Sequence, residues 1–287
     1  MITKAFAKVN LTLSVQGKRT DGYHELAGIM HEIGLCDEIC ITPASLGIQV
    51  KCAEQPGENN TAYKAAYEFM QAAGIRDGLV IDIEKNIPSQ AGLGGASADA
   101  AAVLRSLNEL YGYPVSQEKL FEIGKRVGAD VPFCLHGGCA YAGGIGEKLS
   151  KLTPRQMHIT LVQGEKGIAT KELFSFYDSI TDCRDKNRKE SITPVLTAWE
   201  NGDFCSFYTH MFNSLERAAF IKLPELAETK KRLIADTGAS AALMTGSGSV
   251  IYGIYEDTAS AENAAEYMRS CGYRFACVAE TKTEAYV

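Results

Sequence analysis

A glycine-rich turn that leads into an alanine-rich helix is the feature that most restricts what this chain can fold into. The stretch IPSQAGLGGASADAAAVL, Ile87 to Leu104, places Gly92, Gly94 and Gly95 within four positions. Glycine lets backbone amides approach a ligand without an intervening Cβ, and the N–H groups and dipole at a helix start favour negative charge. The turn therefore predicts an anion site, and phosphate is the preferred ligand.

A purely structural turn, a Walker A loop and a Rossmann loop all fit this stretch less well. A structural turn needs only one or two glycines, and the Walker A pattern is absent. A Rossmann fingerprint requires a third glycine that GLGGAS lacks. It also requires a strand ending in an acidic residue about twenty residues later, where Ser116 instead caps a predicted helix.

Length and composition predict a globular protein of two domains. The chain has 287 residues, a length that exceeds the usual size of one core. Of these residues 46% are hydrophobic and 22% are charged, which is ordinary for a globular protein. No apolar run is long enough to span a membrane, and Lys4, Lys8 and Asn10 interrupt the N-terminal segment, so we expect neither a membrane span nor a secretory signal.

Charge and cysteine usage narrow the class further. The nine cysteines include no C-x-x-C pair, which favours free thiols in a reducing compartment, and we expect a cytoplasmic protein. A net charge of -6 argues against a general nucleic-acid surface. We interpret the one dense basic run, CRDKNRK (Cys183 to Lys189), as a solvated connector.

Hydrophobic periodicity predicts both strands and helices. Residues 5 to 15 alternate, with Lys8 and Asn10 on the polar face, and predict a half-buried strand. Further predicted strands are Gly47–Cys52, Leu79–Glu84, Met157–Gln163, Val250–Tyr255 and Tyr273–Val278. Predicted helices are Asn60–Ala73, Ser97–Tyr111, Ser116–Val127, Asp203–Ala218, Leu223–Asp236 and Thr258–Cys271.

The order of these elements predicts an α+β protein. From about residue 157 a strand, helices, a strand, a helix and a strand follow one another, which is typical of a ferredoxin-like domain. The polar segment from Glu147 to Gln156, with its Pro154, separates the two patterned halves. We therefore predict domains at residues 1–153 and 154–287.

The glycine turn resembles the signature of the GHMP kinase superfamily, which includes galactokinase, homoserine kinase, mevalonate kinase and phosphomevalonate kinase. That signature, P-x-x-x-G-L-G followed by serines and alanines, here runs from Pro88 to Ala101. Three segments, Ala7–Leu26, Gly128–Leu149 and Met244–Gly253, are similar to the 4-diphosphocytidyl-2-C-methyl-D-erythritol kinases of the non-mevalonate isoprenoid pathway. The motif NSLE, Asn213 to Glu216, fits this family more loosely.

The resemblance implies a fold, a reaction and two ligands. The fold is a two-domain GHMP kinase fold, with an N-terminal domain like domain 2 of ribosomal protein S5 and a ferredoxin-like C-terminal domain. The reaction is transfer of the γ-phosphoryl group of ATP, with Mg²⁺, to the 2-hydroxyl of an acceptor that carries a cytidine diphosphate (CDP) group. Phosphoryl transfer depends chiefly on positioning and charge neutralisation.

The resemblance also implies how the turn binds ATP. The residues expected to surround the triphosphate are Pro88, Gln90, Ala91, Gly92, Leu93, Gly94, Gly95, Ala96 and Ser97. Ala96 replaces a glycine common in these kinases and Ala98 a common serine, so Ser97 is the candidate hydroxyl near the metal. Asp99 either helps to hold the metal or complements the helix dipole in the first turn.

Asp130 and Lys8 are the catalytic candidates. From the residues alone, Asp130 is a loop acid, Lys8 a solvated lysine, and Pro132 forces Val131 to be extended. The resemblance implies instead that Asp130 faces the acceptor hydroxyl and accepts its proton, with Lys8 as its partner. A cation there lowers the cost of negative charge on the acceptor oxygen.

The resemblance also implies which residues bind the acceptor. Tyr23 and His24 lie at the cytosine end, and Phe174 lies on the opposite face of the base, since stacking requires a flat partner. Whether His24 reads cytosine by its ring or its backbone stays open. Asn10 lies beside Lys8, and Gly246 and Gly248 of the second glycine loop, TGSGS, are the expected contacts near the phosphate loop.

Two alternatives remain at this point. Another GHMP kinase would act on mevalonate, homoserine or a sugar, but none of these carries the pyrimidine that DGYHE is expected to bind. A non-catalytic RNA-binding module is disfavoured by the acidic balance of charge and by Lys8 with Asp130. We expect a small-molecule substrate, no nucleic-acid or membrane partner, and a monomer or homodimer.

Overall fold

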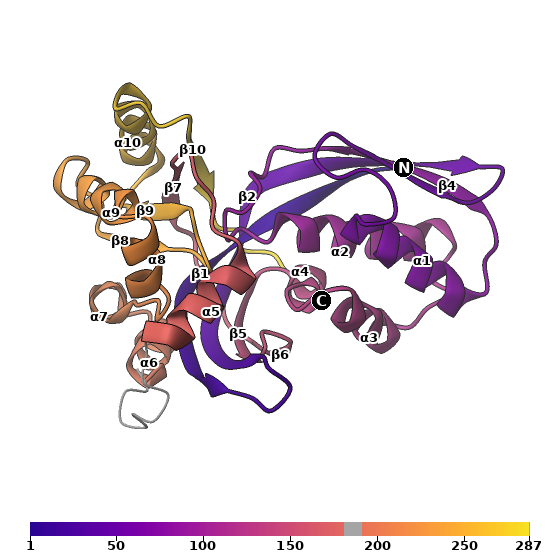
Figure 1. The fold of residues 1–287 in the computed structure, drawn as a ribbon, viewed down its shortest axis with the longest axis horizontal. Coiled ribbons are helices and arrows are strands. Elements are labelled where there is room, and N and C mark those ends of the chain that lie inside the picture. Colours follow the sequence, from indigo (N-terminus) through magenta and orange to yellow (C-terminus); the bar gives the residue numbers. More distant parts are fainter. Residues whose placement is uncertain (181–190, 287) are drawn as a thin grey trace.

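The computed structural model describes residues 1–180 and 191–286, so the predicted connector from Cys183 to Lys189 lies outside the described residues. Ten strands and ten helices are found in the described part (Figure 1). The strands are β1 (Ile2–Lys18), β2 (His24–Ala44), β3 (Ile48–Cys52), β4 (Gly78–Glu84), β5 (Cys139–Gly144), β6 (Lys148–Lys151), β7 (His158–Gln163), β8 (Ala241–Met244), β9 (Ile251–Tyr255) and β10 (Phe275–Glu280). The helices are α1 (Thr61–Ala73), α2 (Gly95–Leu110), α3 (Gln117–Val127), α4 (Val131–His136), α5 (Thr170–Ile180), α6 (Thr193–Asn201), α7 (Phe204–His210), α8 (Glu216–Lys222), α9 (Glu225–Ala235) and α10 (Thr258–Ser270).

The first sheet is built around the long antiparallel pair β1 and β2, which runs from Ile2 opposite Cys40 to Lys18 opposite His24. The other edge of β2 pairs with β4 along one half of its length and with β5 along the other half. β3 extends the sheet beside β4 in parallel, and β6 extends it beside β5. Helices α1 and α2 lie against one side of this sheet, and α3 packs on these two helices (Figure 1).

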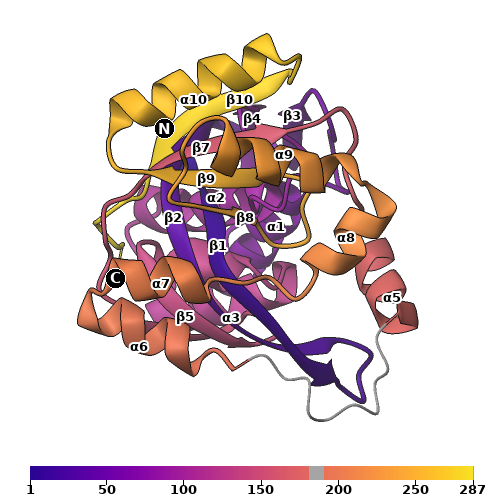
Figure 2. The same ribbon diagram turned by 90° about the vertical axis from the view of Figure 1, so that its left-hand side faces the viewer.

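The second sheet confirms the ferredoxin-like prediction for the C-terminal half. Its strand order is β10-β7-β9-β8, and every pair is antiparallel. In chain order the half reads β7, helices, β8, β9, α10, β10, which is the β-α-β-β-α-β pattern of that fold. Figure 2 shows α10 running along β10 at the edge of this sheet. The sequence pattern missed β8, and the domain boundary at 153/154 stays a prediction.

Periodicity missed several elements, among them β5 and β6, and merged two helices into one. β2 was missed because residues from Ala27 to Ile33 are all buried, and a strand buried on both faces shows no alternation of polar and apolar residues. The single helix predicted over Asp203–Ala218 is two helices, α7 and α8. Between them the backbone instead pairs with β1, where the Leu13 amide donates to Phe212 O at 2.9 Å. Three further helices, α4, α5 and α6, were also missed.

The polar face of β1 is buried, contrary to the prediction of a half-buried strand. Lys8 is 4% exposed and Asn10 2%, because the C-terminal half packs over this face. The Tyr252 hydroxyl donates to Asn10 O at 3.1 Å, and the Asn10 amide donates to Thr245 Oγ1 at 3.0 Å. The strand therefore carries its polar side chains into the region between the two sheets.

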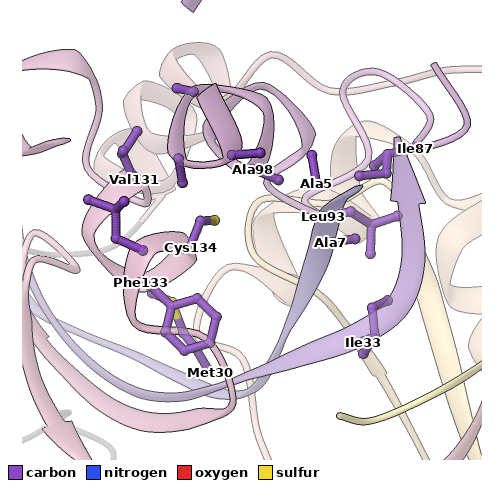
Figure 3. Packing of buried hydrophobic residues seen from close by; sticks show 14 of the residues in the cluster. Ala5, Ala7, Met30, Ile33, Ile87, Leu93, Ala98, Val131, Phe133 and Cys134 are labelled. Carbon is purple, nitrogen blue, oxygen red and sulfur yellow. The ribbon is translucent and has the colours of Figure 1, made fainter. Parts of the chain in front are cut away.

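Small side chains allow helix α2 to approach the sheet closely. Ala98 on α2 is buried, and so are Ala5 and Ala7 on β1, the strand that α2 contacts. Figure 3 shows these alanines in the same core as Phe133 and Cys134 of α4. These small side chains let the start of α2 lie close beside β1.

The C-terminal segment covers a buried carboxylate, which gives the fold a measurable pH dependence. Glu32 is 2% exposed, and burial raises its pKa to about 7, although Arg105, Lys282 and Tyr286 oppose the rise. Because the pKa of Glu32 is raised in the folded protein, its protonated carboxyl favours the folded state in acid. This contribution to the free energy of unfolding is lost as the pH rises through about 7.

We expect Glu32→Gln to remove this loss of stability. Relative to wild type, the free energy of unfolding of the variant should gain about 2–3 kcal/mol between pH 5 and pH 8, because glutamine carries no charge to bury. Urea unfolding of both proteins at the two pH values measures this. An equal difference between variant and wild type at both values would show that Glu32 is not the group responsible.

Candidate functional site

A cavity of about 1030 Å³ is lined by residues from both halves of the chain and brings the predicted site residues together. It is lined by the glycine turn, by Lys8 and Asn10 of β1, by Asp130, by the Tyr23–His24 segment and by Phe174 of α5. Of the predicted site residues, all of which lie in the described part of the chain, Gly248 alone does not line it. Ser97 and Asp130 thus share one hollow, as the phosphate-transfer interpretation requires.

The glycine turn has the backbone that its composition predicts. Gly92 and Gly94 have φ values of +73° and +72°, which other residues rarely adopt. A Cβ on Gly92 would lie 2.1 Å from Thr245 O, and one on Gly94 would lie 3.1 Å from the Lys8 side chain. Gly94 is the N-cap of α2, so the first amides of this helix open toward the cavity that Gly94, Gly95 and Ser97 line.

Lys8 lies at the centre of the cavity wall. Its Nζ donates to Asn10 Oδ1 at 2.6 Å and to Gly92 O at 3.0 Å, and it lies 3.5 Å from Asp130 Oδ2. The predicted pairing of Lys8 with Asp130 is therefore present. The cation links the base candidate to the glycine turn, so it can neutralise negative charge that develops between them.

Asp130 is the N-cap residue of α4, but its side chain forms no capping hydrogen bond. Its side chain is 31% exposed and faces the cavity, where a Cβ on Gly146 would lie 3.6 Å from Oδ1. The prediction that Val131 is extended was wrong, since Val131 is the first residue of α4. Pro132 is tolerated there because amides of a first helical turn have no intrahelical acceptor.

Sequence reasoning missed a buried charge cluster beside the turn. Lys85 forms ion pairs with Asp37 and, at 2.8 Å, with Asp99, and its Nζ would be 3.4 Å from a Cβ on Gly95. Burial raises the pKa of Asp99, with Asp37 adding to the rise and Lys85 opposing it. Asp99 lies in the second turn of α2, which has no acid in its first turn, so the prediction that it complements the helix dipole is wrong.

Three aromatic residues form the end of the cavity that is predicted to bind the cytosine base. The His24 and Phe174 rings stack with centroids 4.8 Å apart and planes 26° apart, while Tyr23 is 59% exposed. His24 Nε2 lies 2.6 Å from Asp178 Oδ1, and Lys18 Nζ donates to Asp178 Oδ2 at 2.6 Å. Asp178 and Lys18 also line the cavity. Asp178 lies outside the segments that resemble the family, and Lys18 lies within Ala7–Leu26, but no role was predicted for it.

The second glycine loop braces the first. Ser249 N donates to Gln90 O at 3.0 Å, and Thr245 Oγ1 donates to Gly92 O at 3.1 Å. Gly246 lines the cavity, whereas Gly248 lies behind its wall, where a Cβ would meet the Met244 side chain.

The motif NSLE supports this second loop from behind. Asn213 Nδ2 donates to Met244 O at 2.7 Å and to Gly246 O at 2.8 Å. Glu216 Oε1 accepts a hydrogen bond from Met244 N at 2.8 Å. The motif therefore contributes to the site by holding the second glycine loop in position.

Known proteins match the chain over almost its whole length. Family models for the GHMP kinases N terminal domain and the GHMP kinases C terminal match residues 60–138 and 195–274. A 4-diphosphocytidyl-2-C-methyl-D-erythritol kinase of Desulfitobacterium hafniense (strain Y51) is 41% identical, over 94% of this chain and 92% of that protein. One from Syntrophomonas wolfei is 43% identical, over 93% of each.

Solved structures agree with these matches. A crystal structure of 4-(cytidine 5'-diphospho)-2C-methyl-D-erythritol kinase has a TM-score of 0.83 and 35% identity, and covers 99% of this chain and 100% of its own. Homoserine kinase from Cytophaga hutchinsonii has a TM-score of 0.76 at 16% identity, over 98% and 95% of the chains, which supports the fold alone.

Proposed function

The chain belongs to the GHMP kinases, and with this membership as the premise we propose that it phosphorylates the 2-hydroxyl of 4-diphosphocytidyl-2-C-methyl-D-erythritol with ATP. The observation that carries the proposal is the single cavity. It joins a glycine turn suited to a triphosphate with an aromatic subsite suited to a pyrimidine, and Lys8 and Asp130 lie along its wall. A donor nucleotide and a CDP-linked alcohol can therefore meet in one hollow.

We assign Asp130 as the group that receives the proton of the acceptor hydroxyl. Its carboxylate has no capping role, faces the cavity and lies 3.5 Å from Lys8 Nζ. As the acceptor oxygen bonds to the γ-phosphorus and the bond to the ADP oxygen breaks, the proton moves to Asp130. Lys8 stabilises the charge on the acceptor oxygen, and the amides of residues 92–96 bind the phosphates.

Magnesium fits the same region of the cavity. Mg²⁺ usually binds one or two carboxylates together with phosphate oxygens and water. Asp99 lines the cavity, is 3% exposed, and its Oδ1 has no hydrogen-bond partner in the described structure. We propose that Ser97 and Asp99 hold the ion, which would neutralise charge on the phosphates. No group of three or more His, Cys, Asp or Glu side chains that could hold a metal by themselves is found among the described residues, so phosphate oxygens and water would complete the coordination.

The alternative acceptors of this superfamily have no group that would bind at the pyrimidine end of the cavity. Mevalonate and homoserine carry no base, so His24, Phe174 and Asp178 would line an unused extension of the cavity. An RNA-binding module is disfavoured because Lys8 is buried beside Asp130 and not displayed on a basic surface.

We place the enzyme in the cytoplasm and predict a monomer or homodimer. The eight cysteines in the described part of the chain are free thiols, in keeping with a reducing compartment. No helix among the described residues could cross a bilayer.

One assay tests the proposed function. The purified protein is mixed with ATP, magnesium and 4-diphosphocytidyl-2-C-methyl-D-erythritol, and ADP and phosphorylated product are followed by ³¹P NMR. We expect one new phosphate monoester, at the 2-position, for each ADP formed. Parallel reactions contain mevalonate, homoserine or galactose. Faster turnover of any of these, or RNA binding without ATP consumption, would refute the assignment.

A further inference from the structure

We propose that Asp178 is a positioning residue that fixes the tautomer of His24 and thereby makes the acceptor site prefer cytosine to uracil. This inference rests on the proposed function, because it concerns the base of the CDP group. It goes beyond that function by explaining how the protein distinguishes two pyrimidines of nearly the same shape, and it assigns a role to a residue outside the sequence motifs.

The contact between Asp178 and His24 determines which ring nitrogen carries the proton. His24 Nε2 lies 2.6 Å from Asp178 Oδ1, and an ionised carboxylate can only accept hydrogen bonds. Nε2 must therefore be the donor, and in the neutral ring Nδ1 keeps its lone pair. No described residue forms a hydrogen bond with His24 Nδ1, so its lone pair is left for a ligand.

Lys18 keeps Asp178 in its charged form. Its Nζ donates to Asp178 Oδ2 at 2.6 Å, so each carboxylate oxygen has its own donor. Burial would raise the pKa of Asp178, but the hydrogen bonds from Lys18 and His24 outweigh it and lower the pKa. Lys18 also supplies a positive charge that balances the carboxylate.

Packing fixes the plane of the His24 ring. Phe174 stacks on the ring, and Tyr177 meets it edge-on, with centroids 6.5 Å apart and planes 83° apart. His24 is 8% exposed and lines the cavity. The ring therefore cannot exchange its two nitrogens by turning over without breaking the bond to Asp178. Its unprotonated edge is a fixed acceptor.

A fixed acceptor distinguishes cytosine from uracil. The exocyclic N4 of cytosine donates hydrogen bonds, whereas uracil has a carbonyl acceptor at the same position. Cytosine can donate to His24 Nδ1, but uracil would place two acceptors face to face. A site that leaves such a polar pair unmatched favours the correct base by about 10–100-fold.

The decisive variant is Asp178→Asn. Asparagine keeps the size of the side chain, and its oxygen is expected to stay with the Lys18 cation, which turns the amide NH₂ toward His24 Nε2. Nε2 must then accept, and the proton moves to Nδ1. We expect the preference for the CDP acceptor over its uridine counterpart, measured as the ratio of kcat/KM, to fall from about 10–100 to about 1. The change should lie in KM, with kcat altered less than about threefold.

Glu172→Gln is the matched control. Glu172 lies on the same helix α5, pairs with Lys222 and does not line the cavity, so its loss removes a carboxylate without touching His24. The control should keep the preference of the wild type. If Asp178→Asn instead lowers kcat/KM equally for both acceptors, the residue only supports the structure and the inference is wrong.

A second measurement separates this inference from the proposed function. Long-range ¹H–¹⁵N NMR of protein labelled at histidine reports which ring nitrogen carries the proton, without any substrate. We expect the Nε2–H tautomer of His24 in wild type and the Nδ1–H tautomer in Asp178→Asn. A wild-type ring protonated at Nδ1, or at both nitrogens, overturns the inference. If neither nucleotide acceptor is phosphorylated, the proposed function fails, while the tautomer result still decides the role of Asp178.

Discussion

Replacing Asp130 with asparagine is expected to lower turnover by about 10²- to 10⁴-fold while the protein stays folded. The amide has nearly the same size but cannot take up the proton of the acceptor hydroxyl. Helix α4 should not suffer, because the Asp130 side chain makes no capping hydrogen bond. KM for ATP should change little, since the amides of the glycine turn are untouched. Steady-state kinetics together with a thermal unfolding curve give both results.

Asp257→Asn is the control for this substitution. Asp257 is also an N-cap aspartate, but it caps α10 by accepting from Ser260 N at 2.7 Å and does not line the cavity. Its replacement should change stability slightly and leave turnover as in wild type. Turnover of Asp130→Asn within a few-fold of wild type would remove Asp130 from the chemistry and leave Lys8 and the helix start as the main source of rate acceleration.

The features that could be predicted from the sequence depend on short-range chemistry. Left-handed backbone at Gly92 and Gly94 follows from residue type, and the start of α3 follows from the capping residue Ser116, whose hydroxyl accepts from Lys119 N at 3.3 Å. The pairing of Lys8 with Asp130 is different. Nothing local places these two residues together, and only the family resemblance predicted the contact that the structure contains.

The features that were missed depend on contacts between distant segments. In the sequence, Lys85 is a lysine that follows a predicted strand, which is typical of the surface. Its ion pairs with Asp37 and Asp99 form only in the folded protein. Asp178 lies on a helix that was not predicted, and its partners Lys18 and His24 lie about 150 residues earlier. Polar residues on β1 were expected to face solvent because periodicity identifies two faces of a strand but not what covers each face.

The second large effect is expected from Gly92→Ala. Gly92 has a φ of +73°, and an added Cβ would lie 2.1 Å from Thr245 O and 3.0 Å from Gly248 N, both of them backbone atoms. Left-handed strain costs about 1–2 kcal/mol and the forced displacement about 1–3 kcal/mol, so we expect a loss of unfolding free energy of about 2–5 kcal/mol. The two glycine loops must separate, so KM for ATP should rise at least about tenfold.

Gly112→Ala separates strain from crowding, because Gly112 has almost the same φ, +74°, with no atom within 4 Å of the added Cβ. This control should lose only about 1–2 kcal/mol and keep the KM for ATP of wild type. Denaturant unfolding and ATP titrations on both variants test the contrast. Equal losses in the two would mean that the loops can part freely, and that the contact between Gly92 and Thr245 does not hold the phosphate turn in place. A larger loss at Gly92, confined to stability and without a change in KM, would mean that ATP binds to a turn that tolerates displacement.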